Sequence, residues 1–411
     1  MSAMLTGLFL GAGASYEIGM PLVWGLTARL KNWLTPENLR ALNSSWRAQG
    51  GGYSDVVIDD LVRILVQSNL HYESILGYLE TQFRRHATPK NHKQEYHGLY
   101  SWLVEIIYHL LYLQHVNQAS NIQRNLRYFE GIARLAASNN PLWIFSLNHD
   151  LVIECLAASY GIPLNCGFGP EIVTLPRRDK SGRKTGELRA EVISSEQLEK
   201  KGMPFTRNGF PGINLLKIHG ALDVFTFRDG GDLLRLLPME SSVEGIMQAL
   251  RSANEDLIYV DPVVPERPAK VINEITYADD QGELQFLRRS ILSGAFKFDR
   301  RHTQVLPMRL LEYFKSHINC VGSLVCIGYG FGDEHVNMVI RGWLEFSADR
   351  RLEIVGPDVK NIPSFLLHVA PQVVLKQSVA TDYLDSATGI KRERSDVLRK
   401  QVLAWVRRRR A

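Results

Sequence analysis

Short apolar runs alternate with segments whose apolar residues recur three and four positions apart, along almost the whole chain. The periodic segments predict amphipathic helices, and the continuous runs predict strands buried on both faces. We expect strands at 5–10, 141–147, 213–218, 320–330 and 352–357. Because helices are expected between these strands, the pattern predicts an α/β fold with a doubly wound, mainly parallel sheet.

Helical periodicity dominates the interval between the first two strands. A helix is expected at 21–33, and Thr35, followed by proline, is a typical cap for the next one. The helical pattern continues to about residue 140, so we interpret 35–140 as a large helical insertion. Its most apolar part, 99–113, is interrupted by a glutamate and a histidine and is shorter than the roughly 18 to 20 residues of a membrane helix. It predicts a buried core helix and no membrane span.

The second half of the chain has a more mixed pattern. Residues 171–212 are polar and interrupted by glycine, which predicts an excursion outside the core. A hairpin is expected around Asp229, with Gly230 and Gly231 in its turn. Helices are expected at 243–251, 284–292 and 308–317. We interpret residues 1–390 as one domain and 391–411 as a basic C-terminal helix or tail.

The positive charge of the chain is concentrated in this tail. The formal net charge is +5, but the residues from Lys391 onward carry nine Lys and Arg side chains against two acids. The first 390 residues therefore carry a net charge of −2, which argues against nucleic-acid binding by the body. For the tail, a solvated helix end, a nucleic acid, an acidic partner and another subunit all fit the charge.

The four cysteines do not form metal-binding pairs, because none of them is spaced as in C-x-x-C. This pattern predicts reduced thiols, no zinc module and no bound metal. The first residues lack a basic leader and a cleavage site. Together these features predict a cytoplasmic protein.

Four of the expected strands end in residues suited to chemistry. The ends are "GAGAS" at 11–15, "LNHD" at 147–150, "KIHGALD" at 217–223 and "GYGFGDEH" at 328–335. The carboxyl ends of parallel strands lie at one edge of a sheet, where such sheets bind their ligands. We therefore expect these four motifs to form one site.

The first glycine turn predicts a phosphate site. Gly11 and Gly13 permit a tight turn and a close approach of the backbone to a pyrophosphate. Ala12, Ser15 and the start of the following helix can then receive the negative charge. A plain tight turn is the alternative.

The second glycine turn, Gly328, Tyr329 and Gly330, fits another phosphate or a ribose. A dehydrogenase is disfavoured, because Tyr16 replaces the third glycine of G-x-G-x-x-G and no acidic ribose ligand is found after the second strand. The following Asp333 is expected to cap a helix.

The two remaining strand ends carry polar side chains that suit catalysis. Asn148 and Asp150 can hold a hydroxyl group or a water molecule, or they can cap the next helix. His219 can serve as a general base or have a structural role. A catalytic role depends on whether the three side chains meet.

In this order, the four motifs resemble the sirtuin superfamily, and in particular the sirtuin-like effector domains of bacterial anti-phage defence systems. The resemblance spans residues 5 to about 357. It implies a Rossmann-like fold that binds NAD as a substrate and breaks the bond between nicotinamide and ribose. Implied phosphate contacts are Gly11, Ala12, Gly13 and Ser15, implied catalytic residues are Asn148, Asp150 and His219, and the implied adenosine side is Gly328, Tyr329 and Gly330.

The chain also departs from the deacylases of this superfamily. They carry a Phe-Arg pair where this chain has Val23 and Trp24, a Gln where it has Leu147, and a zinc module. These departures favour hydrolysis of NAD to nicotinamide and ADP-ribose, with the histidine as base and the asparagine positioning water. A protein deacylase and a non-catalytic NAD or ADP-ribose sensor are the alternatives. The resemblance further implies NAD depletion in abortive infection, a homo-oligomer and a partner such as a helicase-type ATPase.

Overall fold

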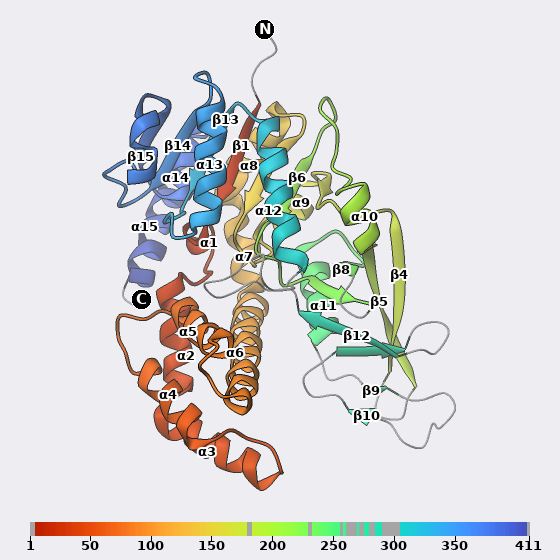
Figure 1. Cartoon of the computed structure of the whole chain (residues 1–411). Coiled ribbons are helices and arrows are strands. Elements are labelled where there is room, and N and C mark those ends of the chain that lie inside the picture. The colour runs from red at the N-terminus through yellow and green to blue at the C-terminus, as the bar shows by residue number, and fades with distance from the viewer. Residues whose placement is uncertain are drawn as a thin grey trace.

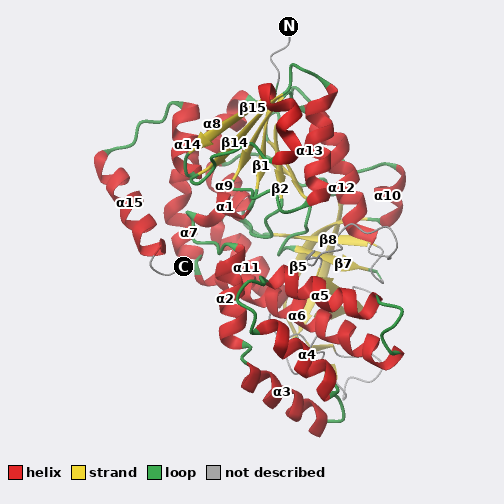
Figure 2. Cartoon of the chain, turned by 60° about the vertical axis from the view of Figure 1, so that its left-hand side comes forward, coloured by secondary structure: helices red, strands yellow, loops and turns green. Residues whose placement is uncertain are grey.

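The computed structural model describes residues 5–178, 183–228, 232–254, 258–259, 269–270, 275–278, 284–289 and 305–408. Figure 1 shows three parts: a parallel sheet with its covering helices, a block of helices from the N-terminal third, and an antiparallel sheet. Figure 2 shows that the helical block lies at one end of the molecule, apart from the strands of the parallel sheet.

A seven-stranded sheet forms the centre of the first part. Its order is β15-β14-β13-β1-β2-β6-β3, and all its strand pairs are parallel. The strands are β1 (Thr6–Leu10), β2 (Leu142–Ser146), β3 (Leu164–Asn165), β6 (Ile213–Lys217), β13 (Ser323–Ile327), β14 (Arg351–Gly356) and β15 (Val373–Gln377). The central strands are buried almost throughout, which explains their continuous apolar sequences. The predicted doubly wound α/β fold is confirmed.

Helices cover both faces of this sheet. In Figure 1, α12 and α13 lie on one face and α8, α9 and α14 on the other. The helices outside the N-terminal block are α9 (Val152–Tyr160), α10 (Ser195–Lys200), α11 (Val243–Asn254), α12 (Val305–His317), α13 (Glu334–Phe346), α14 (Ala380–Thr388) and α15 (Arg394–Arg408), with short 3-10 helices at Leu126–Phe129, Ile318–Cys320 and Ser364–Gln372. Along the sheet, β1 lies between β2 and β13, so the chain order reverses there. This reversal opens a crevice at the carboxyl ends of β1 and β13.

The N-terminal helical block has a hydrophobic core of its own. Its helices are α1 (Ala12–Tyr16), α2 (Val23–Trp33), α3 (Pro36–Ala48), α4 (Asp55–Leu65), α5 (Tyr72–Arg84), α6 (Lys90–Asn117), α7 (Ala119–Asn125) and α8 (Glu130–Ser138), of which α2 to α6 build that core. Thr35 caps α3 as predicted, accepting a hydrogen bond from the Asn38 amide. The long helix α6 links the cores, because Leu103 lies in the block while Tyr108 packs into the core of the sheets.

The antiparallel part is a six-stranded sheet in the order β11-β12-β7-β8-β5-β4. Its strands are β4 (Glu171–Arg178), β5 (Lys184–Ile193), β7 (Val224–Phe227), β8 (Asp232–Leu237), β11 (Ile275–Ala278) and β12 (Leu284–Arg289), and a separate pair is formed by β9 (Ile258–Tyr259) and β10 (Ala269–Lys270). Strands β7 and β8 pair as the expected hairpin, while its turn at 229–231 lies outside the described residues.

Two predictions for this region are wrong. Residues 171–212 are not a polar excursion, because β5 alternates exposed side chains with the buried Leu188, Ala190 and Val192. Residues 284–289 form a strand instead of a helix, paired with β11 and β7. Their apolar spacing suits a helix, but pairing with neighbouring strands decides the conformation of such short segments.

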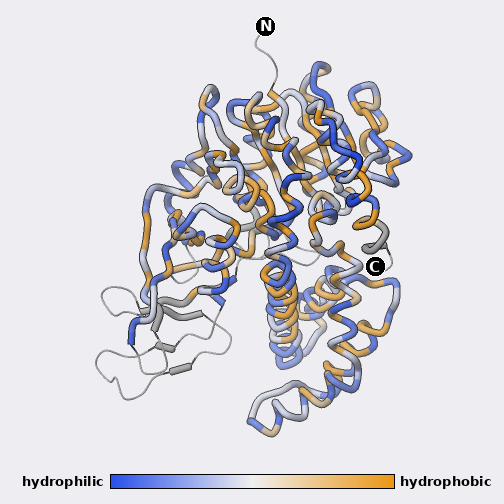
Figure 3. The backbone as a smooth tube through the Cα atoms, turned by 180° about the vertical axis from the view of Figure 1, so that it is seen from behind, coloured by the Kyte–Doolittle hydropathy of each residue, from blue (hydrophilic) through white to orange (hydrophobic). Residues whose placement is uncertain are grey.

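Apolar segments follow the two sheets and the inner sides of the helices in Figure 3. In the described part of the chain, no helix combines the length and the apolar character needed to cross a bilayer. The segment 99–113 is part of α6, and its Leu99, Leu103 and Ile107 are buried within the helical block, as expected for a core helix.

Much of the basic tail is tied into the fold. Arg392 pairs with Asp385 at 2.7 Å, and Lys400 on α15 pairs with the same carboxylate at 3.3 Å. Both basic side chains are nearly buried. The tail is thus more than a solvated helix end, although Val397 and Leu398 on α15 remain exposed. Of the contact residues expected at 405–410, the side chains lie outside what the structure describes.

The position of Gly328 generates a stability prediction. Its φ of +64° lies in the left-handed region, and a Cβ there would approach the Ala14 nitrogen to 2.4 Å. Gly328→Ala should therefore lower the free energy of unfolding by at least about 2 kcal/mol in urea denaturation. Gly342→Ala, at an open position of α13, is the control and should stabilise by about 0.5–1 kcal/mol. Equal effects of the two substitutions would contradict the close contact.

The buried His115 on α6 generates a pH prediction. Burial, and then the charge of Lys217, lower the pKa of His115 to about 3. Below pH 6.5 the unfolded chain binds a proton that the folded chain does not, so stability falls as pH falls. This loss should reach roughly 2 kcal/mol between pH 7 and pH 5. His115→Leu should flatten the pH dependence by this amount in urea titrations, whereas His86→Gln, at an exposed site, should not. An unaltered profile in His115→Leu would refute the assignment.

Candidate active site

A cleft of about 770 Å³ opens at the carboxyl ends of β1, β2, β6 and β13. Its lining includes residues from all four predicted motifs, among them Gly11, Asn148, His219 and Tyr329. The prediction that these strand ends meet agrees with this geometry. The volume is in the range of small-molecule and cofactor sites.

The two glycine turns pack directly against each other. The amide of Gly11 donates to the Ile327 carbonyl at 3.0 Å, and the amide of Gly13 donates to the Gly328 carbonyl at 2.9 Å. A Cβ at Gly11 would approach the Gly328 oxygen to 2.6 Å. The contact between the turns thus requires glycine by itself, and these two amides already have acceptors within the protein.

Only part of the first turn faces the cleft. Gly11 and Ala12 belong to the lining, whereas Gly13 and the buried Ser15 lie behind it. The hydroxyl of Ser15 accepts a hydrogen bond from the Asn148 side chain at 3.1 Å. In this arrangement Ser15 and Gly13 support the site from behind, which differs from the predicted direct phosphate contacts.

Asn148 is fixed on three sides. Its side-chain nitrogen donates to the Gly11 carbonyl at 3.0 Å as well as to Ser15, and its backbone amide donates to the Ser146 hydroxyl at 3.1 Å. The side chain is almost buried, yet the residue contributes to the cleft wall. Because the nitrogen is engaged, the Oδ1 atom is the group of Asn148 that can orient a water molecule or a hydroxyl group.

Asp150 combines both roles that its sequence position allows. Its Oδ1 atom accepts from the Val152 amide at 3.1 Å, where α9 begins, and the residue also lines the cleft. Its carbonyl oxygen accepts a hydrogen bond from Lys217. The capping and the site interpretations therefore hold together.

His219 forms a pair that the sequence analysis missed. Its Nε2 atom lies 3.1 Å from Oδ2 of Asp333, and both side chains are largely buried. The other oxygen of Asp333 caps α13, accepting from the amides of His335 and Val336 at 3.1 and 3.2 Å. The predicted cap is confirmed, and the same carboxylate also orients the imidazole and can stabilise its charged form. The fourth motif contained this signal, because Asp333 follows a strand end at the same edge as His219.

Tyr329 anchors the second glycine turn. Its hydroxyl donates to the Asn337 side chain at 3.0 Å and accepts from the Asp333 amide at 3.2 Å. Its ring packs against Phe9 and Phe331, and burial raises the pKa of the phenol. Tyr329 and Gly330 both line the cleft, as expected for a ligand turn.

The helical block supplies the opposite wall, which the sequence analysis did not foresee. The starts of α2 and α5 bring Trp24, His71 and Glu73 to the cleft. Trp24 is 52% exposed and meets the His71 ring edge to face at 5.6 Å between centroids. An exposed aromatic ring beside a carboxylate suits a flat ligand with hydrogen-bond donors.

Within the described residues, no group of three or more His, Cys, Asp or Glu side chains gathers as metal ligands would. The cysteines are free thiols, and burial raises the pKa values of Cys155, Cys166 and Cys326, which keeps them protonated. The side chains described above can act without drawing on these thiols.

No protein-family model and no curated protein matches the chain. Among solved structures, the crystal structure of a Sir2 homolog–NAD complex is similar over 93% of this chain and 88% of that chain, with 11% sequence identity and a TM-score of 0.37. The two chains thus superpose only loosely, and the function proposed below rests on the geometry of the cleft.

The His219–Asp333 pair can be tested without a ligand. Asp333→Asn keeps an oxygen for the cap of α13 but removes the charge that faces His219. In a double-mutant cycle with His219→Phe, urea denaturation should give a coupling energy of about 0.5–1 kcal/mol. The same cycle with the exposed His86→Ala should be additive. Additivity for both histidines would contradict the pair.

Proposed function

We propose that the protein is an NAD⁺ glycohydrolase that cleaves the bond between nicotinamide and ribose and releases nicotinamide and ADP-ribose. The observation that carries this proposal is the convergence of Asn148, Asp150 and His219 on one cleft, beside two glycine turns. A dinucleotide has phosphates for the turns and a ribose for the polar groups. The cleft also lies at the switch point of the parallel sheet, where such folds bind nucleotides.

The chemistry asks little of an acid, because nicotinamide leaves as a neutral molecule from a cationic ring. When the bond between C1 of the ribose and the pyridinium nitrogen breaks, its electron pair stays on nicotinamide. A water oxygen then bonds to the cationic C1, and its proton must be removed. Positioning and electrostatic stabilisation can therefore supply several kcal/mol of the barrier reduction.

Each site residue has a role in this scheme. The Oδ1 atom of Asn148 orients the water or a ribose hydroxyl, and His219 accepts the proton. Asp333 holds the imidazole and stabilises the imidazolium that forms. Asp150 maintains the loop geometry at the start of α9. Ala12, Tyr329 and Gly330 contact the phosphates and the adenosine side.

The biological setting is a further part of the proposal and rests on the motif resemblance alone. A freely active NAD hydrolase would harm its host, so we propose activation in trans, by a partner such as a helicase-type ATPase in anti-phage defence. Exposed Val397 and Leu398 on α15 and the helical block are the surfaces we assign to oligomer or partner contacts.

Kinetics of site variants test the proposal. Asn148→Ala and His219→Ala should each reduce nicotinamide release by at least about 100-fold, the contribution expected of a positioned acid–base group. Asn319→Ala and His368→Ala, at exposed positions of the same residue types, should keep the wild-type rate. Wild-type rates in both site variants would overturn the assignment.

The alternatives give different outcomes in the same assay. Nicotinamide release that requires an acylated peptide would identify a deacylase. Tight binding of NAD or ADP-ribose, with NAD intact after long incubation, would identify a sensor.

A further inference from the structure

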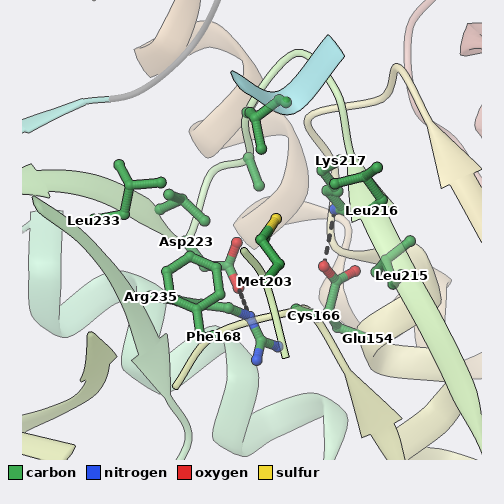
Figure 4. A pocket seen from close by; sticks show the side chains of 14 residues that line it. Glu154, Cys166, Phe168, Met203, Leu215, Leu216, Lys217, Asp223, Leu233 and Arg235 are labelled. Carbon is green, nitrogen blue, oxygen red and sulfur yellow. Dashed lines mark hydrogen bonds and ion pairs between the residues drawn. The ribbon is translucent and has the colours of Figure 1, made fainter. Parts of the chain in front are cut away.

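Four charged side chains lie buried beneath the loops that carry Asn148 and His219: Lys217, Glu154, Asp223 and Arg235, here called the buried charge cluster (Figure 4). Their side chains are between 4% and 11% exposed. Lys217 pairs with Glu154 at 2.9 Å, and Arg235 pairs with Asp223 at 3.1 Å. Apolar residues of similar volume are often at least as stabilising as such pairs. Their place beside the candidate site points to a role besides stability.

Lys217 touches the candidate catalytic loop directly. It is the last residue of β6 and precedes His219 by two positions. Its ammonium group donates a hydrogen bond to the carbonyl of Asp150 and lies 2.9 Å from the Glu154 carboxylate on α9. One cation therefore joins the strand that leads to His219, the loop after β2 and the first turns of α9.

The loop after His219 is held from the other side. The Leu222 amide donates to the His149 carbonyl at 3.0 Å. Asp223 binds Arg235 on β8, which also binds Glu191 on β5 at 2.6 Å. The two loops of the site are thus tied to each other and to the antiparallel sheet.

Lys217 keeps its charge in this environment. Burial lowers the pKa of Lys217, but the carboxylates of Glu154, Asp223 and Asp150 outweigh burial and raise it. Burial raises the pKa of Glu154, and the Lys217 charge opposes that shift. An ammonium group therefore faces the Asp150 carbonyl at neutral pH.

We propose that Lys217 is a positioning residue for the loop 147–150. Its ammonium group, held by Glu154, sets the place of the Asp150 backbone and thereby the relation of the Asn148 side chain to the His219 ring. The kinetic part of this inference rests on the proposed function, whereas the restraint on the loop does not depend on any reaction. A merely structural ion pair would change stability and leave the turnover of the folded enzyme intact.

Hydrogen–deuterium exchange of the full chain tests the restraint without a substrate. In Lys217→Met, amides at 147–151 should exchange about 10-fold faster than in the wild type, since the loop loses its clamp. Lys217→Arg keeps a cation with donors and should change exchange by less than about 3-fold. Glu80→Gln breaks another nearly buried pair, Glu80 with Arg84 in α5, and should leave exchange at 147–151 unaltered.

A double variant separates positioning from stability. Lys217→Met alone leaves Glu154 as a buried carboxylate without its cation. Lys217→Met/Glu154→Leu removes both charges and should melt at a higher temperature than Lys217→Met. Its loop should still exchange faster than in the wild type. Its kcat for NAD hydrolysis should fall about 10- to 100-fold with KM within about 3-fold, because small displacements of reacting groups are this costly.

Wild-type exchange at 147–151 in the double variant, or a wild-type kcat, would overturn the role of Lys217. If the wild-type protein does not hydrolyse NAD, the proposed function fails, and the exchange result alone decides whether Lys217 holds the loop.

Discussion

The candidate site depends on the contact between two backbone turns, at Gly11–Gly13 and at Gly328. These turns end neighbouring parallel strands, and each exchanges hydrogen bonds or van der Waals contacts with the other at distances that exclude a Cβ. The contact places the Gly11 carbonyl where the Asn148 side chain can donate to it. One steric requirement of the sheet thus fixes the crevice, the first turn and the candidate catalytic amide together.

The sequence was sufficient for the parallel sheet and for the meeting of its strand ends. Long buried strands in a parallel sheet have an unambiguous apolar signal, and sheet geometry then brings their carboxyl ends to one edge. The antiparallel sheet was harder to predict. Residues 284–289 have helical spacing but pair with β11 and β7, and β5 alternates behind a polar surface. Such short strands are determined by neighbours that are distant in the sequence.

The same limit applies within the site. Asn148, Asp150 and His219 were recognisable because each follows a strong strand. Asp333 was recognised only as a cap, since its second oxygen meets His219 across 114 positions of the chain. Trp24 and His71 reach the cleft through the packing of α2 and α5, which no local pattern encodes. Lys217 was hidden for a related reason, because a lysine inside an apolar strand acquires its partners only when α9 packs against β6.

The central claim is that this cleft consumes NAD instead of borrowing it. The most direct measurement is a time course of NAD, nicotinamide and ADP-ribose with the purified full-length chain, alone and with the product of the adjacent gene, in the absence of acylated peptide. The account predicts that NAD disappears while nicotinamide and ADP-ribose appear in equal amounts. Intact NAD under both conditions would contradict it.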